Sequence, residues 1–105
     1  MKGFLFRLIP PRADFAFTMT ESERAMMLRH LSYWSNLVAQ GTAVVFGPVG
    51  DPEGPYGIGI ALVPDMNAAE VLRDGDPAMA SPFGFRTEIT PMLSLVTQSG
   101  RFDAM

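Results

Sequence analysis

Residues 20–40, TESERAMMLRHLSYWSNLVAQ, carry the strongest local signal in this chain of 105 residues. Thr20 and Glu23 have the spacing of a capping box, in which the threonine hydroxyl accepts the backbone N–H of Glu23 and the carboxylate accepts that of Thr20. Gly41 supplies a helix stop. The sequence therefore predicts one long helix over residues 20–40.

Apolar side chains recur along one arc of this predicted helix, at about 100° per residue. His30 lies near the middle of the arc, whose apolar members are Met26, Met27, Leu31, Trp34, Leu37 and Val38. The helix is therefore expected to pack this face, with its histidine, against the rest of the fold.

Strand-like segments lie on both sides of the helix. The sequence predicts strands at residues 3–9, 42–49, 56–64 and 84–90, and a short helix at residues 67–74 with Asn67 as its N-cap. Residues 50–55, GDPEGP, are dense in turn formers, so the second and third strands form a hairpin. The order βαββαβ predicts an α+β, ferredoxin-like fold with two helices on one face of a four-stranded antiparallel sheet.

The predicted sheet is apolar on both faces. In its first strand, Phe4 and Phe6 alternate with Leu5 and Ile9. No element remains to cover the second face, so the sheet needs a partner. We predict a homodimer associated sheet to sheet, a dimeric α+β barrel, whose interface includes Phe4, Phe6 or their opposite-parity neighbours. Residues 93–105 have no clear period, and we interpret them as a tail available to pack on another subunit.

Composition narrows the class of protein further. The length is that of a single domain spanning residues 1–105. With no cysteine and one histidine, we expect neither a metal site nor a cofactor. The net charge of −3 and the scattered basic residues argue against nucleic acid. The apolar runs are too short for a membrane span, and Arg7 and Pro10 interrupt the first one, so we expect a cytoplasmic protein.

His30 is the side chain that normally titrates near neutrality. One interpretation makes it a general acid/base in a pocket between helix and sheet, and the other a buried histidine with both ring nitrogens satisfied. Asp76, before Pro77, either starts a turn or reaches His30 from beyond the neighbouring helix, where it would fix the tautomer of the imidazole. Asp74 is the competing carboxylate, expected to be solvated.

Further residues are candidates for binding a small organic ligand. Arg7 and Arg86 could hold an anionic substrate or form surface contacts. Tyr33 and Trp34 are either pocket walls or core. The candidate substrate-binding set is Arg7, Trp34, Phe46, Gly47 and Pro48, in which Gly47 and Pro48 mark either a pocket rim or a strand irregularity. Gly57 and Gly59 are expected inside a strand, not in a phosphate loop.

In the order and spacing of several segments, the chain resembles the YciI-like (YCII-related domain) family over most of residues 4–92. The matching pieces are RHLSYW around His30, FGPV at residues 46–49, DPEGPYGIGI at residues 51–60 and DGDPAMASPFGF at residues 74–85. The resemblance implies a ferredoxin-like fold, a dimeric α+β barrel and a His/Asp-centred site, which maps onto His30 and Asp76. The chain departs from shorter members at PPRADFAFTMTESE, residues 10–23.

Two functional hypotheses follow. The first is a small cytosolic enzyme with His30 as general acid/base and Asp76 as its orienting partner. The second is a non-catalytic, ligand-binding or structural homodimer. A solvent-reachable cavity at His30 favours the first, and a sealed, fully packed His30 favours the second.

Overall fold

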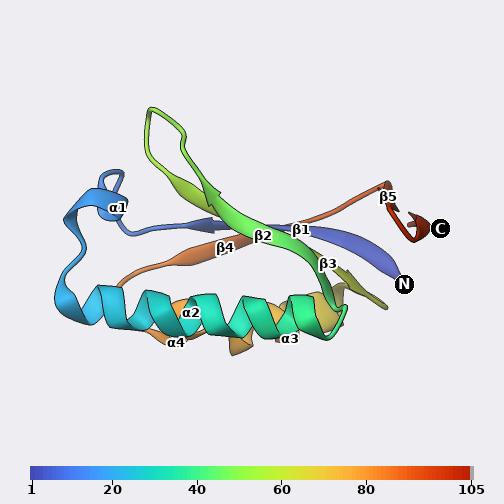
Figure 1. Cartoon of the computed structure of the whole chain (residues 1–105), viewed down its shortest axis with the longest axis horizontal. Helices are drawn as coiled ribbons and strands as arrows, with labels where there is room; N and C mark the ends of the chain where they lie inside the picture. The colour runs from blue at the N-terminus through green and yellow to red at the C-terminus, as the bar shows by residue number, and fades with distance from the viewer. Residues whose placement is uncertain (105) are drawn as a thin grey trace.

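The computed structural model describes residues 1–104, and Figure 1 shows its elements in chain order. They are β1 (Lys2–Ile9), α1 (Phe15–Thr18), α2 (Glu21–Ala39), β2 (Ala43–Val49), β3 (Tyr56–Val63), α3 (Met66–Gly75), α4 (Pro77–Ala80), β4 (Arg86–Pro91), β5 (Ser94–Thr97) and β6 (Gly100–Asp103). The long helix and the four strands predicted from the sequence are present, with ends shifted by one or two residues.

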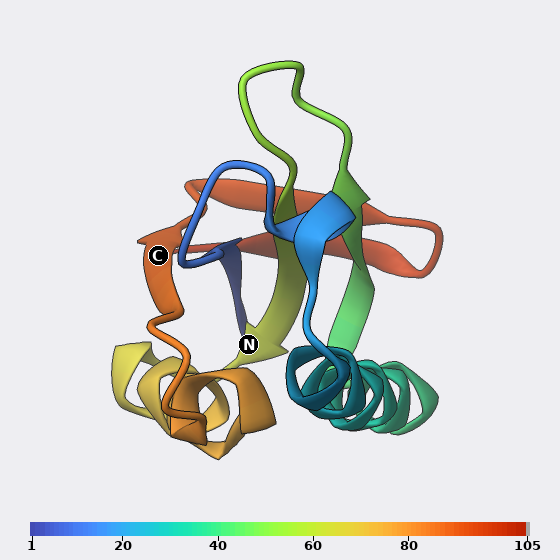
Figure 2. The same ribbon diagram turned by 90° about the vertical axis from the view of Figure 1, so that its left-hand side faces the viewer.

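The main sheet has the antiparallel order β2-β3-β1-β4. Helices α2 and α3 lie side by side on the same face of this sheet (Figure 2). The fold is therefore α+β and ferredoxin-like, which confirms the predicted class. Within residues 1–104, no helix is long and apolar enough to cross a membrane.

The N-terminus of α2 is fixed by the predicted capping box. Thr20 Oγ1 accepts the backbone N–H of Glu23 at 3.1 Å, and the Glu23 carboxylate accepts that of Thr20 at 2.8 Å. Arg12 adds two bonds to the same carboxylate, at 2.8 and 2.9 Å. Gly41 follows the helix with a φ of 79°, as its predicted role as the stop requires. These bonds fix the residue at which α2 begins and tie the preceding segment to it through Arg12.

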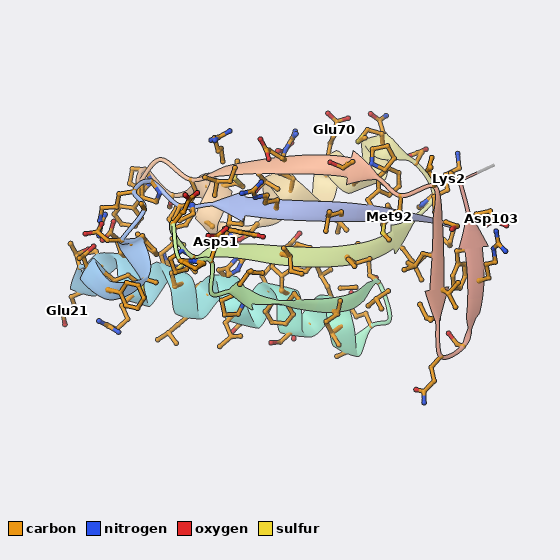
Figure 3. The ribbon with its side chains drawn as sticks, turned by 90° about the horizontal axis from the view of Figure 1, so that it is seen from above. Lys2, Glu21, Asp51, Glu70, Met92 and Asp103 are labelled. Carbon is orange, nitrogen blue, oxygen red and sulfur yellow. The ribbon has the colours of Figure 1, made fainter. Side chains whose placement is uncertain are left out.

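The core lies between the helices and one face of the sheet. Phe4 and Phe6 are buried there, and the rings of Phe6 and Trp34 meet edge to face with centroids 5.3 Å apart. Both phenylalanines are covered within the subunit, so of the residues predicted for a dimer interface the opposite-parity neighbours are the ones left available. Leu5 and Ile60 pair across β1 and β3 and alternate with the residues that face the core, so they belong to the other face of the sheet. Figure 3 views the sheet from that face, with the helices behind it.

The residues after β4 form structure that the sequence analysis did not predict. Strands β5 and β6 pair as a hairpin that crosses one end of the main sheet (Figure 3). Leu95 of this hairpin is buried, and its side chain packs against Gly3, where a methyl group would lie 3.0 Å from it. Residues 94–103, interpreted from the sequence as part of a tail available to another subunit, thus form two strands, one of which packs on β1 of the same subunit. Met105, the last residue of that segment, lies outside the described residues.

The cap of α3 and the short helix α1 also differ from what the sequence predicted. Asp65, not Asn67, caps α3, since its carboxylate accepts the backbone N–H of Ala68 at 2.9 Å. Residues 10–19 form α1 and its flanking turns, and Phe15 of α1 is buried against Phe85 with ring centroids 4.9 Å apart. Phe15 therefore belongs to the core of the domain, while most of the segment around it is exposed.

Candidate active site

His30 and Asp76 meet at one point between α2 and the junction of α3 with α4. His30 Nδ1 lies 2.9 Å from both carboxylate oxygens of Asp76. The contact predicted from the sequence is therefore present. The Asp76 side chain is 5% exposed and that of His30 is 14% exposed, so solvent screens the pair weakly.

Local sequence explains why Asp76 stands there. It ends α3 and caps α4, whose first residue is Pro77, and its Oδ1 accepts the backbone N–H of Ala78 at 2.9 Å. Proline suits the first position of a helix because its fixed φ is helical and the N–H it lacks has no partner there. Asp76 thus starts a turn and bonds His30 at once, so the two interpretations of this residue hold together.

Trp34 supplies a third donor to the same carboxylate. Its indole Nε1 donates to Asp76 Oδ2 at 3.0 Å. An ionised carboxylate is acceptor-only, and it matches the three donors that His30, Trp34 and Ala78 present. In the neutral imidazole the Nδ1 proton then points at Asp76, which leaves a lone pair on Nε2. The arrangement can therefore hold His30 in the tautomer that accepts a proton at Nε2.

The second ring nitrogen of His30 is left accessible. Within residues 1–104, no buried side-chain nitrogen or oxygen lacks a hydrogen-bond partner. Nε2 has no such partner in that part of the chain, so it is not fully buried, and His30 is one of the residues that line the cavity described next. We infer that Nδ1 fixes the ring and that Nε2 faces the cavity.

A cavity of about 360 Å³ lies beside His30. Its walls come from β1, the segment of α1, α2, β2, β3, α3 and the start of β4. They comprise Phe6, Leu8, Pro10, Phe15, Ala16, Met19, Met27, His30, Leu31, Trp34, Phe46, Gly47, Pro48, Pro55, Tyr56, Gly57, Ile58, Gly59, Arg73, Asp76, Phe85 and Thr87. Ligand sites are typically concave and mostly apolar with a few placed polar groups, and this lining has that character.

Gly59 on β3 makes room for Trp34, the aromatic neighbour of the His30–Asp76 pair. A methyl group at Gly59 would lie 2.6 Å from the Trp34 ring. Phe46, which pairs with Gly59 across the strands, stacks on the same indole with centroids 6.1 Å apart. Since both glycines of GIG, Gly57 and Gly59, lie within β3, they belong to a strand and not to a phosphate loop.

Four of the five candidate substrate-binding residues line the cavity: Trp34, Phe46, Gly47 and Pro48. Arg7 does not. It pairs with Ile58 on the face of the sheet away from the helices, and its guanidinium lies 4.3 Å from the centroid of the Tyr56 ring. Alternation along β1 sends this side chain to the opposite face from Phe6 and Leu8.

The remaining candidates, Arg86, Asp74 and Tyr33, are not among the residues that line the cavity. Arg86 is exposed and pairs with Glu88, outside the cavity. Asp74 is exposed and binds Arg73 at 2.9 Å, as expected for the competing carboxylate. Tyr33 donates its hydroxyl to the Leu72 carbonyl at 2.8 Å, and burial, together with the charge of Asp76, raises the pKa of this phenol. Tyr33 therefore belongs to the core.

Several lining residues were not identified from the sequence. Phe85 and Thr87 alternate on one face of the predicted fourth strand, and that alternation was the signal available for them. Phe15 lies in the segment between β1 and α2, which gave no periodic signal. Arg73 occupies the last turn of α3, where a basic residue usually indicates only a favourable helix end.

The donor set does not suggest a metal centre. Within residues 1–104, no group of three or more His, Asp or Glu side chains is arranged to hold a metal ion.

Comparison with known proteins agrees with this architecture. A family model described as the YCII-related domain matches residues 4–93. The match covers most of the chain, including His30, Asp76 and the cavity walls, and it confirms the family that the sequence resembles. No curated protein matches the chain.

Proposed function

This chain belongs to the YCII-related domain family, and we propose that it is a small-molecule enzyme with His30 as general acid/base and Asp76 as its orienting partner. The observation that carries the proposal is the pairing of His30 Nδ1 with a buried carboxylate at 2.9 Å, with Nε2 left unpaired in a residue that lines a cavity. A positioned imidazole of this kind typically contributes about 10²- to 10⁴-fold to a proton-transfer step.

In the proposed cycle, His30 Nε2 takes up one proton from the substrate and later releases it. Nε2 accepts a proton from a substrate held in the cavity, and the imidazolium that forms is stabilised by the Asp76 carboxylate beside Nδ1. The proton then returns to the substrate at another atom or leaves with a departing group. Trp34 keeps Asp76 in place through its indole N–H, so it is a positioning residue in this scheme.

The open cavity favours the enzyme over a purely structural dimer. A structural histidine is expected to have both nitrogens bonded within the fold, because an unpaired polar group in such surroundings costs about 1–3 kcal/mol. Here one nitrogen of His30 faces a space of about 360 Å³. That space supports a role that includes a ligand.

We propose in addition that the enzyme is a cytoplasmic homodimer. Members of the family typically form dimeric α+β barrels. In this chain Leu5, Ile58 and Ile60 are only partly buried, Val45 is exposed, and all four lie on the sheet face that carries no helix. A second copy would cover that face. Light scattering at micromolar concentration should give twice the chain mass, and a monomeric mass would refute the dimer.

Carbethoxylation by diethyl pyrocarbonate tests the proposed role of His30. The reagent acylates an unprotonated imidazole nitrogen, and His30 is the only histidine in the sequence, so the histidine signal reports on one residue. We expect rapid modification of the wild type at Nε2. We expect slower modification of Asp76→Asn. A neutral amide holds the proton on Nδ1 less firmly than the carboxylate does, so Nε2 is a weaker nucleophile. Asp74→Asn is the matched control and should react like the wild type, since this carboxylate is exposed.

Equal rates in Asp76→Asn and in the wild type would refute the orienting role of Asp76. For catalysis itself, a compound turned over by the wild type must lose turnover in both His30→Ala and Asp76→Asn. Both variants must keep the mass of the wild-type assembly and a cooperative unfolding transition. Retained turnover in a folded His30→Ala would refute the enzyme proposal.

A further inference from the structure

The polar groups along the cavity differ in what they have left to offer a ligand. The Asp76 oxygens are taken by three donors, from His30, Trp34 and Ala78. Thr87 directs its hydroxyl to the sulfur of Met79 at 3.2 Å. Tyr56 also lines the cavity, but its ring lies against the guanidinium of Arg7, on the sheet face away from the helices. Of His30, Asp76 and Thr87, only His30 keeps an acceptor for an incoming group, at Nε2.

Charge around the cavity does not favour an anion. Arg73 is the cation in the lining, but its Nε donates to Asp74 at 2.9 Å and its Nη2 lies 3.8 Å from Glu70. The one guanidinium of the lining is thus already paired with two carboxylates, and the carboxylate of the lining itself is Asp76. A ligand anion would find no free cationic side chain in the lining, and removing it from water without such a partner is costly.

A ligand cation is not favoured either. The carboxylate that it would approach inside the cavity, Asp76, already accepts three hydrogen bonds and is nearly covered. Asp74 and Glu70 are exposed on α3 and engaged with Arg73. The interior of the cavity therefore suits an uncharged molecule.

Two groups of aromatic side chains contribute to the walls of the space. Phe6 and Phe46 flank Trp34, whose indole bonds Asp76. Phe15 and Phe85 form the other group and meet edge to face at 86°, and Phe15 comes from the segment between β1 and α2. A volume of about 360 Å³ between such walls accommodates a body the size of a substituted ring.

We propose that the site takes an uncharged, ring-sized apolar molecule with a single weakly acidic O–H, which donates its hydrogen bond to His30 Nε2. This inference rests on the proposed function, because it uses the same nitrogen that accepts the proton there. It adds the class of ligand: neutral, apolar over most of its surface, and a donor at one point.

A set of four matched compounds tests the ligand class. 4-Methylphenol is an uncharged ring with an O–H donor, and 4-methylanisole is an uncharged ring of similar size without that donor. 4-Hydroxybenzoate and 4-hydroxybenzylamine add a negative and a positive charge at neutral pH. Trp34 is the only tryptophan of the chain and lines the cavity, so its fluorescence reports binding directly.

We expect 4-methylphenol to bind about tenfold or more tightly than each of the other three, because the others lack the donor or carry an uncompensated charge. In His30→Ala the preference for the phenol over the anisole should disappear. Arg86→Ala, a change on the exposed surface outside the cavity, should leave the preference intact. The comparison of the four compounds on the wild type needs no variant, so it stands if His30→Ala fails to fold.

The ligand class is overturned if 4-hydroxybenzoate or 4-hydroxybenzylamine binds most tightly, if no compound binds, or if the phenol preference survives in His30→Ala. These outcomes are separate from a failure of the proposed function. Tight binding of a charged compound, together with rapid, Asp76-dependent carbethoxylation of His30, would keep the acid/base site and reject only the ligand class. If 4-methylphenol binds most tightly but His30 is carbethoxylated at the same rate in Asp76→Asn and in the wild type, the ligand class is kept and the orienting role of Asp76 is rejected.

Discussion

Replacement of Gly59 by alanine should damage both the core and the site, although the change adds only one methyl group. That methyl would lie 2.6 Å from Cζ3 and 2.7 Å from Cη2 of Trp34. Carbon atoms in contact are normally about 3.5–4.0 Å apart, so the ring must move by roughly 1 Å. It has little freedom to do so, because Phe6 and Phe46 flank it and its Nε1 is bonded to Asp76.

The expected cost follows from two opposing effects. Overpacking of a tight core costs about 1–3 kcal/mol. The lower backbone entropy of alanine in the unfolded chain returns about 0.4–1 kcal/mol. Gly59→Ala should therefore lower the free energy of unfolding by about 1–2 kcal/mol, and it should shift the Trp34 indole N–H resonance as the bond to Asp76 is strained.

Gly57→Ala is the matched control in the same strand. Its methyl would lie 3.4 Å from Leu8 Cβ, an ordinary contact, and neither glycine has a positive φ. This variant should be as stable as the wild type or slightly more stable. Urea unfolding followed by Trp34 fluorescence at fixed protein concentration measures both. Equal stability of Gly59→Ala and Gly57→Ala would refute the argument that glycine at residue 59 makes room for the indole.

Three other predictions concern caps and charges. Thr20→Ala should cost about 1 kcal/mol of stability and leave ligand affinity unchanged; an unchanged unfolding midpoint would show that the capping box contributes nothing. Hydrogen bonds from Arg12, and then that from the Thr20 backbone, lower the pKa of Glu23 from 4.5 to about 2. The stability that this carboxylate contributes is therefore fully present above pH 4.5 and is lost as the pH falls through about 2. Acid should accordingly destabilise the wild type more steeply than Glu23→Gln. Circular dichroism recorded against pH measures the difference. Asp76→Asn should lose about 1–3 kcal/mol, because its amide donor would face buried donors, whereas Asp74→Asn should unfold at the wild-type urea concentration.

The agreement between the predicted and observed fold comes from signals that are local in the chain. The capping box at Thr20 and the stop at Gly41 involve groups only a few residues apart, and both are present. The strands were recognisable because alternation reflects which face each residue takes. The cap of α3 was misplaced because Asp65 and Asn67 are both good capping residues, and only the backbone path of the chain selects between them.

The candidate site was predicted in part. The position of His30 on the apolar arc and the Asp-Pro step at Asp76 identified the two groups that meet at 2.9 Å. The bond from Trp34 to Asp76 was not foreseen, because it joins residues 42 positions apart. Arg7 was assigned to the ligand, yet alternation along β1 places its side chain on the sheet face away from the helices.

The sequence by itself determined the element order, the long capped helix and the presence of a titratable group on its buried face, because these depend on spacing along the chain. Tertiary structure decided the rest: the order β2-β3-β1-β4, the packing of Phe15 on Phe85 in the cavity wall, the bond of Trp34 to Asp76, and the β5–β6 hairpin over Gly3. These features bring together segments distant in sequence, and they depend on how well side chains fit and on which donors each buried acceptor meets. Local spacing does not encode that fit, so it emerges only when the elements pack.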